Sequence, residues 1–136
     1  MGIYDSQIAS LKSKIDNRYK KIRILKGNIR ELDAMYAKCE KISVKVSETM
    51  SNIFQNIDRN SAEVSGNFAA YYKSQIDEIA RKNRLYDISG ATSNDKNQIR
   101  NKIFFNEDKI QCLCNEINLL EADLAYYQAN NIESKV

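Results

Sequence analysis

The sequence predicts an all-α fold, an elongated antiparallel helical hairpin with coiled-coil-like packing and an interrupted return arm. Apolar residues recur at heptad spacing in the N-terminal part of the chain and again in the C-terminal part. The 136 residues include no proline and only four glycines, and 29% of them are charged, which suits a nearly all-helical chain. A three-helix up-down-up bundle is the alternative topology.

The first helix is expected over about 6–58. Its apolar positions alternate in steps of three and four residues, and only Arg18 and Ser43 among them are not apolar. These positions, here called the seam, are Ile8, Leu11, Ile15, Arg18, Ile22, Leu25, Ile29, Leu32, Tyr36, Cys39, Ser43, Val46, Met50, Ile53 and Ile57. A period of 3.5 residues sustained over about seven heptads is typical of coiled-coil packing. A helix cannot cover its own seam, so other parts of the chain, or a partner, must do so.

The remainder of the chain is expected to form the return arm within a single helical domain, 1–136. A turn is predicted at about 59–67 and a second helix at about 68–87. Residues 88–94 are rich in the turn formers Ser, Gly and Asn and are predicted to be a loop. The last helix is predicted at about 95–131. At 1.5 Å per residue, the two return helices together are about as long as the first helix. The two arms of a hairpin would therefore have matching lengths.

The last helix carries two apolar stripes. The first is its seam: Ile99, Ile103, Asn106, Ile110, Leu113, Ile117, Leu120, Leu124 and Tyr127. The second, here called the outer stripe, lies about 130° round the helix at a strict spacing of seven: Phe105, Cys112, Leu119 and Tyr126. One stripe suffices for a hairpin, so the second predicts another neighbour. That neighbour is either part of a three-helix or dimeric core or a different protein docking on this face.

Charge is unevenly distributed along the chain. Residues 1–59 contain twelve Lys or Arg and seven Asp or Glu, whereas residues 107–136 contain two and six. Between Lys12 and Arg30, eight basic residues accompany Asp16 alone. The favoured interpretation is a solvated helix face that complements the acidic C-terminal arm when the two run antiparallel. Nucleic-acid binding is the weaker interpretation, because no aromatic or glycine-rich recognition motif interleaves the charges.

The sequence contains no recognisable arrangement of the residue types that catalysis needs. The chain has no histidine, and Cys39, Cys112 and Cys114 form no C-x-x-C pair. We therefore expect free thiols in a reducing cytosol, no catalytic site, no metal site, no cofactor and no small-molecule substrate. No apolar run approaches the roughly 20 residues that a membrane-spanning helix requires. A non-enzymatic binding protein is the expected class.

The stretch Val64-Ser65-Gly66-Asn67-Phe68-Ala69-Ala70-Tyr71-Tyr72 resembles the W-x-G turn of the WXG family of small helical-hairpin proteins. Gly66 matches the glycine, Ala69 the small residue and Tyr72 the aromatic residue, while Val64 occupies the tryptophan position. The layout of the chain also resembles the YwqH-like branch of small helical proteins. Those proteins are encoded beside type VII secretion toxins that carry an LXG targeting domain.

The resemblance implies a targeting partner or chaperone that binds the helical N-terminal domain of an LXG-type toxin. A larger toxin or effector, with a second small helical protein as an additional candidate, would be the partner, and homo-oligomerisation stays open. The outer stripe would be the partner-binding surface. The expected location is the cytoplasm, with co-export to the extracellular space as an open alternative.

The family's export signal is an aromatic residue followed four positions later by an acidic residue. Phe104 and Asp108 are favoured by position, at the start of the last helix, over Tyr36/Glu40 and Phe54/Asp58. Two other functions remain as alternatives, a self-assembling coiled-coil scaffold and, more weakly, a basic helical protein that binds nucleic acid.

Overall fold

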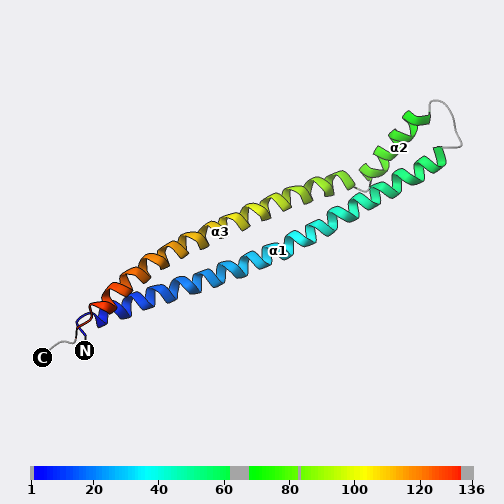
Figure 1. The fold of residues 1–136 in the computed structure, drawn as a ribbon. Helices are drawn as coiled ribbons and strands as arrows, with labels where there is room; N and C mark the ends of the chain where they lie inside the picture. The colour runs from blue at the N-terminus through cyan, green and yellow to red at the C-terminus, as the bar shows by residue number, and fades with distance from the viewer. Residues whose placement is uncertain (1, 62–67, 83, 133–136) are drawn as a thin grey trace. The chain divides into compact units, whose positions relative to one another are not determined.

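The computed structural model describes residues 2–61, 68–82 and 84–132, and these residues form three α-helices. They are α1 (Asp5–Ser61), α2 (Phe68–Lys82) and α3 (Leu85–Ala129), and the described residues contain no β-strand (Figure 1). The chain comprises two compact units. Unit 1 is Met1–Leu32 with Asn101–Val136, and unit 2 is Asp33–Arg100, so α1 and α3 each contribute to both. The predicted all-α class is confirmed.

The predicted seam of α1 is its covered face. Every seam position from Ile8 to Ile53 is buried or half-buried, including the polar positions Arg18 and Ser43. Between those two ends, Gly27 is the one other residue of α1 that is not exposed. The side chain of Ile57 lies outside the described residues. The 3.5-residue period therefore identifies the packing face of the helix along its described length.

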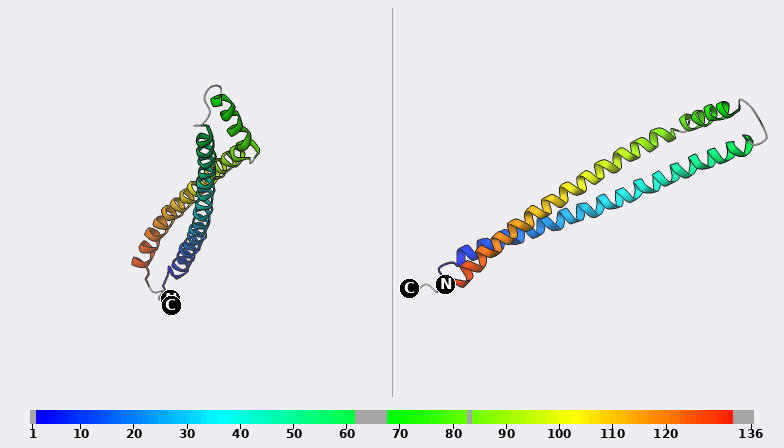
Figure 2. Two further views of the ribbon diagram at one scale, coloured as in Figure 1. Left: turned by 90° about the vertical axis from the view of Figure 1, so that its right-hand side faces the viewer. Right: turned by 45° about the horizontal axis from the view of Figure 1, so that its top comes forward.

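In unit 1, α1 and α3 lie side by side and run antiparallel (Figures 1 and 2). The rings of Tyr4 and Tyr127 meet edge to face with centroids 5.0 Å apart. Further along, Arg18 forms a 2.9 Å ion pair with Glu116. Later residues of α1 thus meet earlier residues of α3, so the two helices run antiparallel. A hairpin has this arrangement, whereas in an up-down-up bundle the first and third helices run parallel.

In unit 2, the return arm consists of α2 followed by the first part of α3. Val46 from α1, Ala80 from α2 and Leu85 from α3 form a buried cluster, against which Met50 and Ile53 pack. All three helices are therefore represented in one small core. The hairpin is confirmed in this unit as well, with a return arm that is interrupted, as expected.

The position of the interruption differs from the prediction. Residues 88–94, predicted to be a loop, are helical and belong to α3. Gly90 faces open space, so its lack of a side chain marks no turn. Thr92 is buried, and its hydroxyl donates a 2.7 Å hydrogen bond to the carbonyl of Ile88, one turn earlier. Burial at Leu85, Thr92 and Ile99 extends the seam through this segment, and such packing overrides a weak local helix propensity.

α2 ends at Lys82 and α3 begins at Leu85, so the observed break lies between these two residues rather than at 88–94. Arg84 adopts a positive φ of 55°, and its N–H donates to the carbonyl of Arg81 at 3.1 Å. Its own carbonyl accepts the N–H of Ile88 at 2.9 Å, which starts α3. A left-handed residue just past a helix end is a common helix stop, usually provided by glycine. The sequence offers no glycine here, so composition did not reveal the break.

The two ends of unit 1 are joined by a polar clasp around Asn131. The Asn131 side chain accepts the Tyr4 N–H at 2.9 Å and donates to the Asp5 carboxylate at 2.9 Å. Asp5 also accepts the Gly2 N–H at 2.8 Å, and the Ile3 N–H donates to the Ile132 carbonyl at 2.9 Å. The hydrogen bond from Asn131 lowers the pKa of Asp5 most, and the hydrogen bond from the Gly2 N–H lowers it further.

We predict that Arg84→Gly stabilises the protein by about 0.5–1 kcal/mol, because glycine adopts the left-handed conformation without the steric cost that a side chain carries. Urea unfolding followed by circular dichroism measures the change. Arg81→Gly, in the last turn of α2, is the matched control and should destabilise by up to about 1 kcal/mol. Equal destabilisation by both substitutions would contradict the backbone assignment at Arg84.

We predict that the clasp opens in acid. Because the pKa of Asp5 is lowered in the folded chain, its contribution is complete at neutral pH and is lost as pH falls below about 4 and through the folded pKa. The protection factor of the Tyr4 amide against hydrogen exchange, the ratio of its intrinsic to its observed rate, should fall across this range, because its N–H donates to Asn131. In Asn131→Ala the amide should show no protection at any pH. Protection of the Tyr4 amide that persists in the variant would show that the clasp does not depend on Asn131.

Candidate partner-binding surface

The outer stripe of α3 is exposed throughout. Phe105, Leu119 and Tyr126 keep 60%, 71% and 60% of their surface accessible, and Cys112 is exposed as well. All four lie in the part of α3 that belongs to unit 1. The seam positions of the same helix from Ile99 to Tyr127 are buried or half-buried in contrast. The two stripes predicted on this helix therefore have different environments, one covered by α1 and the other open.

A groove runs between α1 and α3 beside the outer stripe in unit 1. It has a volume of about 530 Å³ and a mainly apolar lining. Leu25 and Leu113 are seam residues, whereas Ile24, which is 63% exposed, and Phe105 stand beside them. The remaining lining residues are Lys21, Asp108, Lys109, Cys112 and Glu116. The outer stripe thus adjoins a concave apolar surface with charged groups at its margins.

Charged groups on α3 are held near the groove by specific contacts. The Lys109 Nζ lies 4.5 Å from the centre of the Phe105 ring, which is cation–π geometry. Glu116 forms its ion pair with Arg18 of α1. The lining therefore combines a cation over an aromatic ring with an acidic group that α1 already neutralises.

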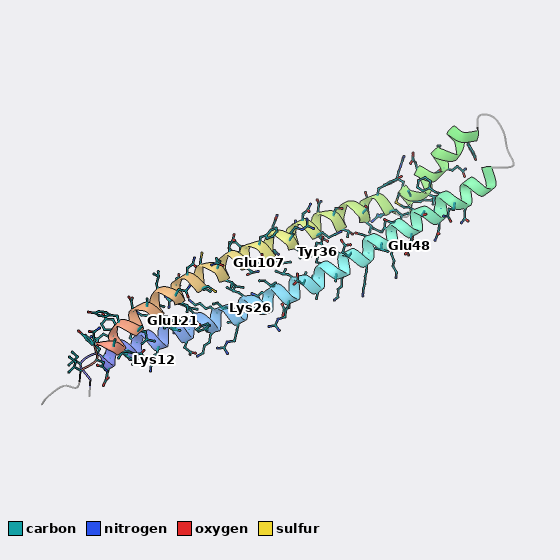
Figure 3. All side chains as sticks on the ribbon, viewed as in Figure 1. Lys12, Lys26, Tyr36, Glu48, Glu107 and Glu121 are labelled. Carbon is teal, nitrogen blue, oxygen red and sulfur yellow. The ribbon has the colours of Figure 1, made fainter. Side chains whose placement is uncertain are left out.

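The basic stretch of α1 faces acidic residues of α3 in unit 1. Besides the Arg18–Glu116 pair, the Tyr19 hydroxyl donates a 3.3 Å hydrogen bond to Glu121, and the negative charge of Glu121 raises the pKa of Tyr19. Figure 3 shows Lys12 at the level of Glu121, and Lys26 at the level of Glu107. Lys20 pairs with Asp16 within α1 at 3.1 Å. These contacts support the interpretation of the basic stretch as a face that complements the acidic arm.

Unit 2 holds a second group of cations, around the ring of Tyr36. Lys96 and Arg100 each lie 5.5 Å from the ring centre, and Arg100 donates a 2.7 Å hydrogen bond to the Tyr36 hydroxyl. Lys96 also forms an ion pair with Glu40, and the hydrogen bond to that carboxylate raises the pKa of Lys96. These groups satisfy one another across the helix pair, so this cluster is best explained as part of the packing.

The three aromatic–acid pairs have different environments. Phe104 is 55% exposed, Asp108 is exposed, and both lie on α3 within unit 1. Tyr36 and Glu40 take part in the packing contacts of unit 2. The side chain of Asp58 lies outside the described residues. Phe104/Asp108 is therefore the pair whose described side chains are accessible, and its role as an export signal stays a prediction.

The turn motif falls largely outside the described part of the chain. Val64 and Gly66 are in the segment 62–67, which the structure does not describe. Ala69 and Tyr72 belong to α2, but their side chains lie outside the described residues. The resemblance at this motif therefore stays a prediction.

The sequence did not single out Ile24, Lys21 or Lys109 as parts of the surface. Ile24 is an apolar residue next to the seam position Leu25, on a helix face that is otherwise largely polar. An isoleucine outside the seam can indicate a binding surface. Whether it does so here depends on which α3 residues lie beside it, and the sequence alone does not show that. Lys109 follows Phe105 by four residues, the spacing at which helical side chains meet, so that contact was accessible to sequence analysis.

Several functional classes find no site in the described residues. No three Asp, Glu or Cys side chains among them are gathered as ligands of a metal ion would be. None of the described helices has a segment long and apolar enough to span a bilayer. The three cysteines are free thiols, with Cys112 exposed and Cys39 and Cys114 half-buried. The apolar surface of α3 with its adjoining groove is accessible, as is a second apolar groove beside Ile42 and Val44 in unit 2.

Comparison of the chain with family models, with curated proteins and with solved structures gives no match.

We predict that Cys112 reacts first with a thiol reagent in dilute solution, because it is exposed while Cys39 and Cys114 are half-buried. Mass spectrometry of peptides after brief maleimide treatment should find most of the label at Cys112. Cys112→Ser should remove the fast phase and leave the slow one. If Cys112 in the dilute chain reacted no faster than Cys39, the outer stripe would not be accessible.

Proposed function

We propose that this protein is a non-enzymatic helical binding protein that acts as a targeting partner, or chaperone, for the helical N-terminal domain of an LXG-type toxin exported by type VII secretion. The observation that carries the proposal is the outer stripe of α3, exposed at all four positions in unit 1. Large apolar side chains that are exposed along one helix face and flanked by charged residues are a candidate interaction site.

The form of the surface suits a helical partner. The stripe repeats every seven residues, so a second amphipathic helix lying along it would meet an apolar side chain at each heptad. The groove beside it offers Ile24 of α1 as a further apolar contact next to Phe105. A small-molecule substrate, by contrast, usually binds in an enclosed pocket with convergent polar groups. A helix in the groove is therefore the occupant that this geometry favours.

The resemblance at Val64–Tyr72 and in the layout of the chain suggests the partner's identity. Chains with that layout accompany LXG toxins, whose N-terminal targeting domains are helical. A hairpin with one covered seam and one open stripe would complete its packing by adding helices from such a domain. Phe104 and Asp108 lie on α3 and remain the candidate export signal.

The proposal is tested first by measuring mass with light scattering, on the chain alone and mixed with the helical N-terminal domain of the toxin encoded beside it. We expect a stable complex of the two proteins. A chain that forms a tight homo-oligomer and ignores the toxin domain would favour the scaffold alternative. Binding to nucleic acid that falls steeply with salt would favour the third function, a basic helical protein that binds nucleic acid.

We predict that replacing both Leu119 and Tyr126 with Lys abolishes binding to the toxin domain and leaves the hairpin helical. Each side chain would contribute about 1.5–3 kcal/mol when buried by a partner, so the double substitution should weaken binding more than about 100-fold. Titration calorimetry measures the affinity, and circular dichroism checks the helix content.

The matched control replaces Val44 and Ile88 with Lys. Both are apolar and exposed, at 52% and 40%, and neither belongs to the outer stripe. This variant adds the same charge and should bind normally. Unchanged affinity in the Leu119/Tyr126 variant would show that the outer stripe is not the docking face.

A further inference from the structure

The outer stripe has a property that the proposed toxin complex does not use. Its four positions, Phe105, Cys112, Leu119 and Tyr126, are evenly spaced, so a two-fold axis through its midpoint exchanges the first with the last and the two central ones with each other. An identical stripe running antiparallel would therefore place Phe105 level with Tyr126 and Cys112 level with Leu119. Every contact would pair two different side chains, with the small Cys112 opposite the larger Leu119.

The charges beside the stripe obey the same symmetry. Three residues before each stripe position stand Lys102, Lys109, Glu116 and Asp123, two cations followed by two anions. In the antiparallel arrangement, Lys109 of one copy comes within about 1.5 Å, along the helix axis, of the level of Asp123 in the other. Because a two-fold axis repeats every contact, this attraction occurs twice. The two Glu116 side chains meet near the axis, where each is already paired with Arg18.

A parallel arrangement would not form this pairing. In a parallel dimer the two-fold axis runs along the helices, so the charged rows of the two copies lie on opposite sides of the interface and Lys109 does not meet Asp123. Flanking charges of this kind commonly determine the orientation of paired helices.

We propose that the free chain forms an antiparallel homodimer through the outer stripe of α3, with Lys109 of each copy paired to Asp123 of the other. The occupant of the exposed face in the absence of another partner is thus a second copy of this chain. The inference concerns the isolated protein and does not depend on the toxin. If the proposed function is also correct, the same face serves two occupants in turn, and the toxin domain must displace the second copy.

The dimer should be weak. Four apolar side chains per copy form a contact far smaller than the roughly 20–30 residues a side of a stable interface. Weak self-association would cover the apolar face at high concentration and still release it to a tighter partner.

Sedimentation equilibrium of the full chain across about 1–300 µM tests the proposal, with three charge variants. Lys109→Asp and Asp123→Lys should each weaken the dimer at least tenfold, because each places like charges together twice. Combining the two should restore the wild-type affinity, since the attraction is rebuilt with its signs exchanged. Lys38→Asp, a charge reversal at an exposed position of α1 away from the stripe, should leave the dimer unchanged.

A covalent measurement checks the alignment independently. In a chain with Cys39→Ser and Cys114→Ser, the added substitution Leu119→Cys should give a rapid disulfide between Cys112 of one copy and position 119 of the other when oxidised glutathione is added, which accepts the two electrons and is released as reduced glutathione. Peptide mapping identifies the bond. A chain that stays monomeric up to about 300 µM, a double charge variant that is not restored, or a dominant Cys112–Cys112 bond would each overturn the antiparallel dimer. Failure of toxin binding would not affect these results, so the two proposals fail separately.

Discussion

The packing of the α1 seam against the return arm is the interaction on which everything else in this protein depends. Helices of 57 and 45 residues have no stability of their own that could keep them ordered without a covered apolar face. Two paired helices cover only a narrow face on each, and no described side chain is completely buried. Large apolar residues elsewhere on the helices, such as Leu119 and Ile24, consequently stay at the surface. The exposed apolar surface of α3 follows from the small size of the two-helix core in the described part of unit 1, where no third helix covers it.

The helix faces that follow the heptad repeat could be predicted from the sequence. The break in the return arm, which follows no repeat, could not. The 3.5-residue period identified the covered face of α1 and of most of α3, including the polar seam positions Arg18 and Ser43. The residue composition was misleading over 88–94, where serine, glycine and asparagine suggested a loop in a segment that is helical. The decisive facts there were the burial of Thr92 and the hydrogen bond that its hydroxyl makes to Ile88. The observed break contains Arg84 in the left-handed conformation, which cannot be predicted from the residue type.

Part of the candidate surface could likewise be predicted from the sequence, and part of it could not. The strict spacing of Phe105, Cys112, Leu119 and Tyr126 was enough to identify the outer stripe from the sequence. The groove needed the pairing of helices, because Ile24 and Phe105 are 81 positions apart and only the antiparallel alignment brings them to one concave surface. The turn motif, which carries most of the family resemblance, includes residues outside the described part of the chain. The proposed function therefore rests on the α3 surface, with the resemblance supplying the identity of the partner.

The polar contacts between the helices have a consequence for alignment. An apolar heptad seam is nearly unchanged when one helix slides by seven residues along the other, so the seam alone permits several registers. In the observed register, Arg18 meets Glu116 and Lys96 meets Glu40. Sliding α3 one heptad in one direction would bring Arg18 to the level of Lys109, a second cation. Sliding it in the other direction would bring Arg18 to the level of Asp123, another acid, but would bring Glu40 to the level of Ile103, which offers no charge. Surface ion pairs contribute little to the free energy of unfolding. Here a few of them distinguish one register from its neighbours, and so decide which residues of α1 accompany the outer stripe.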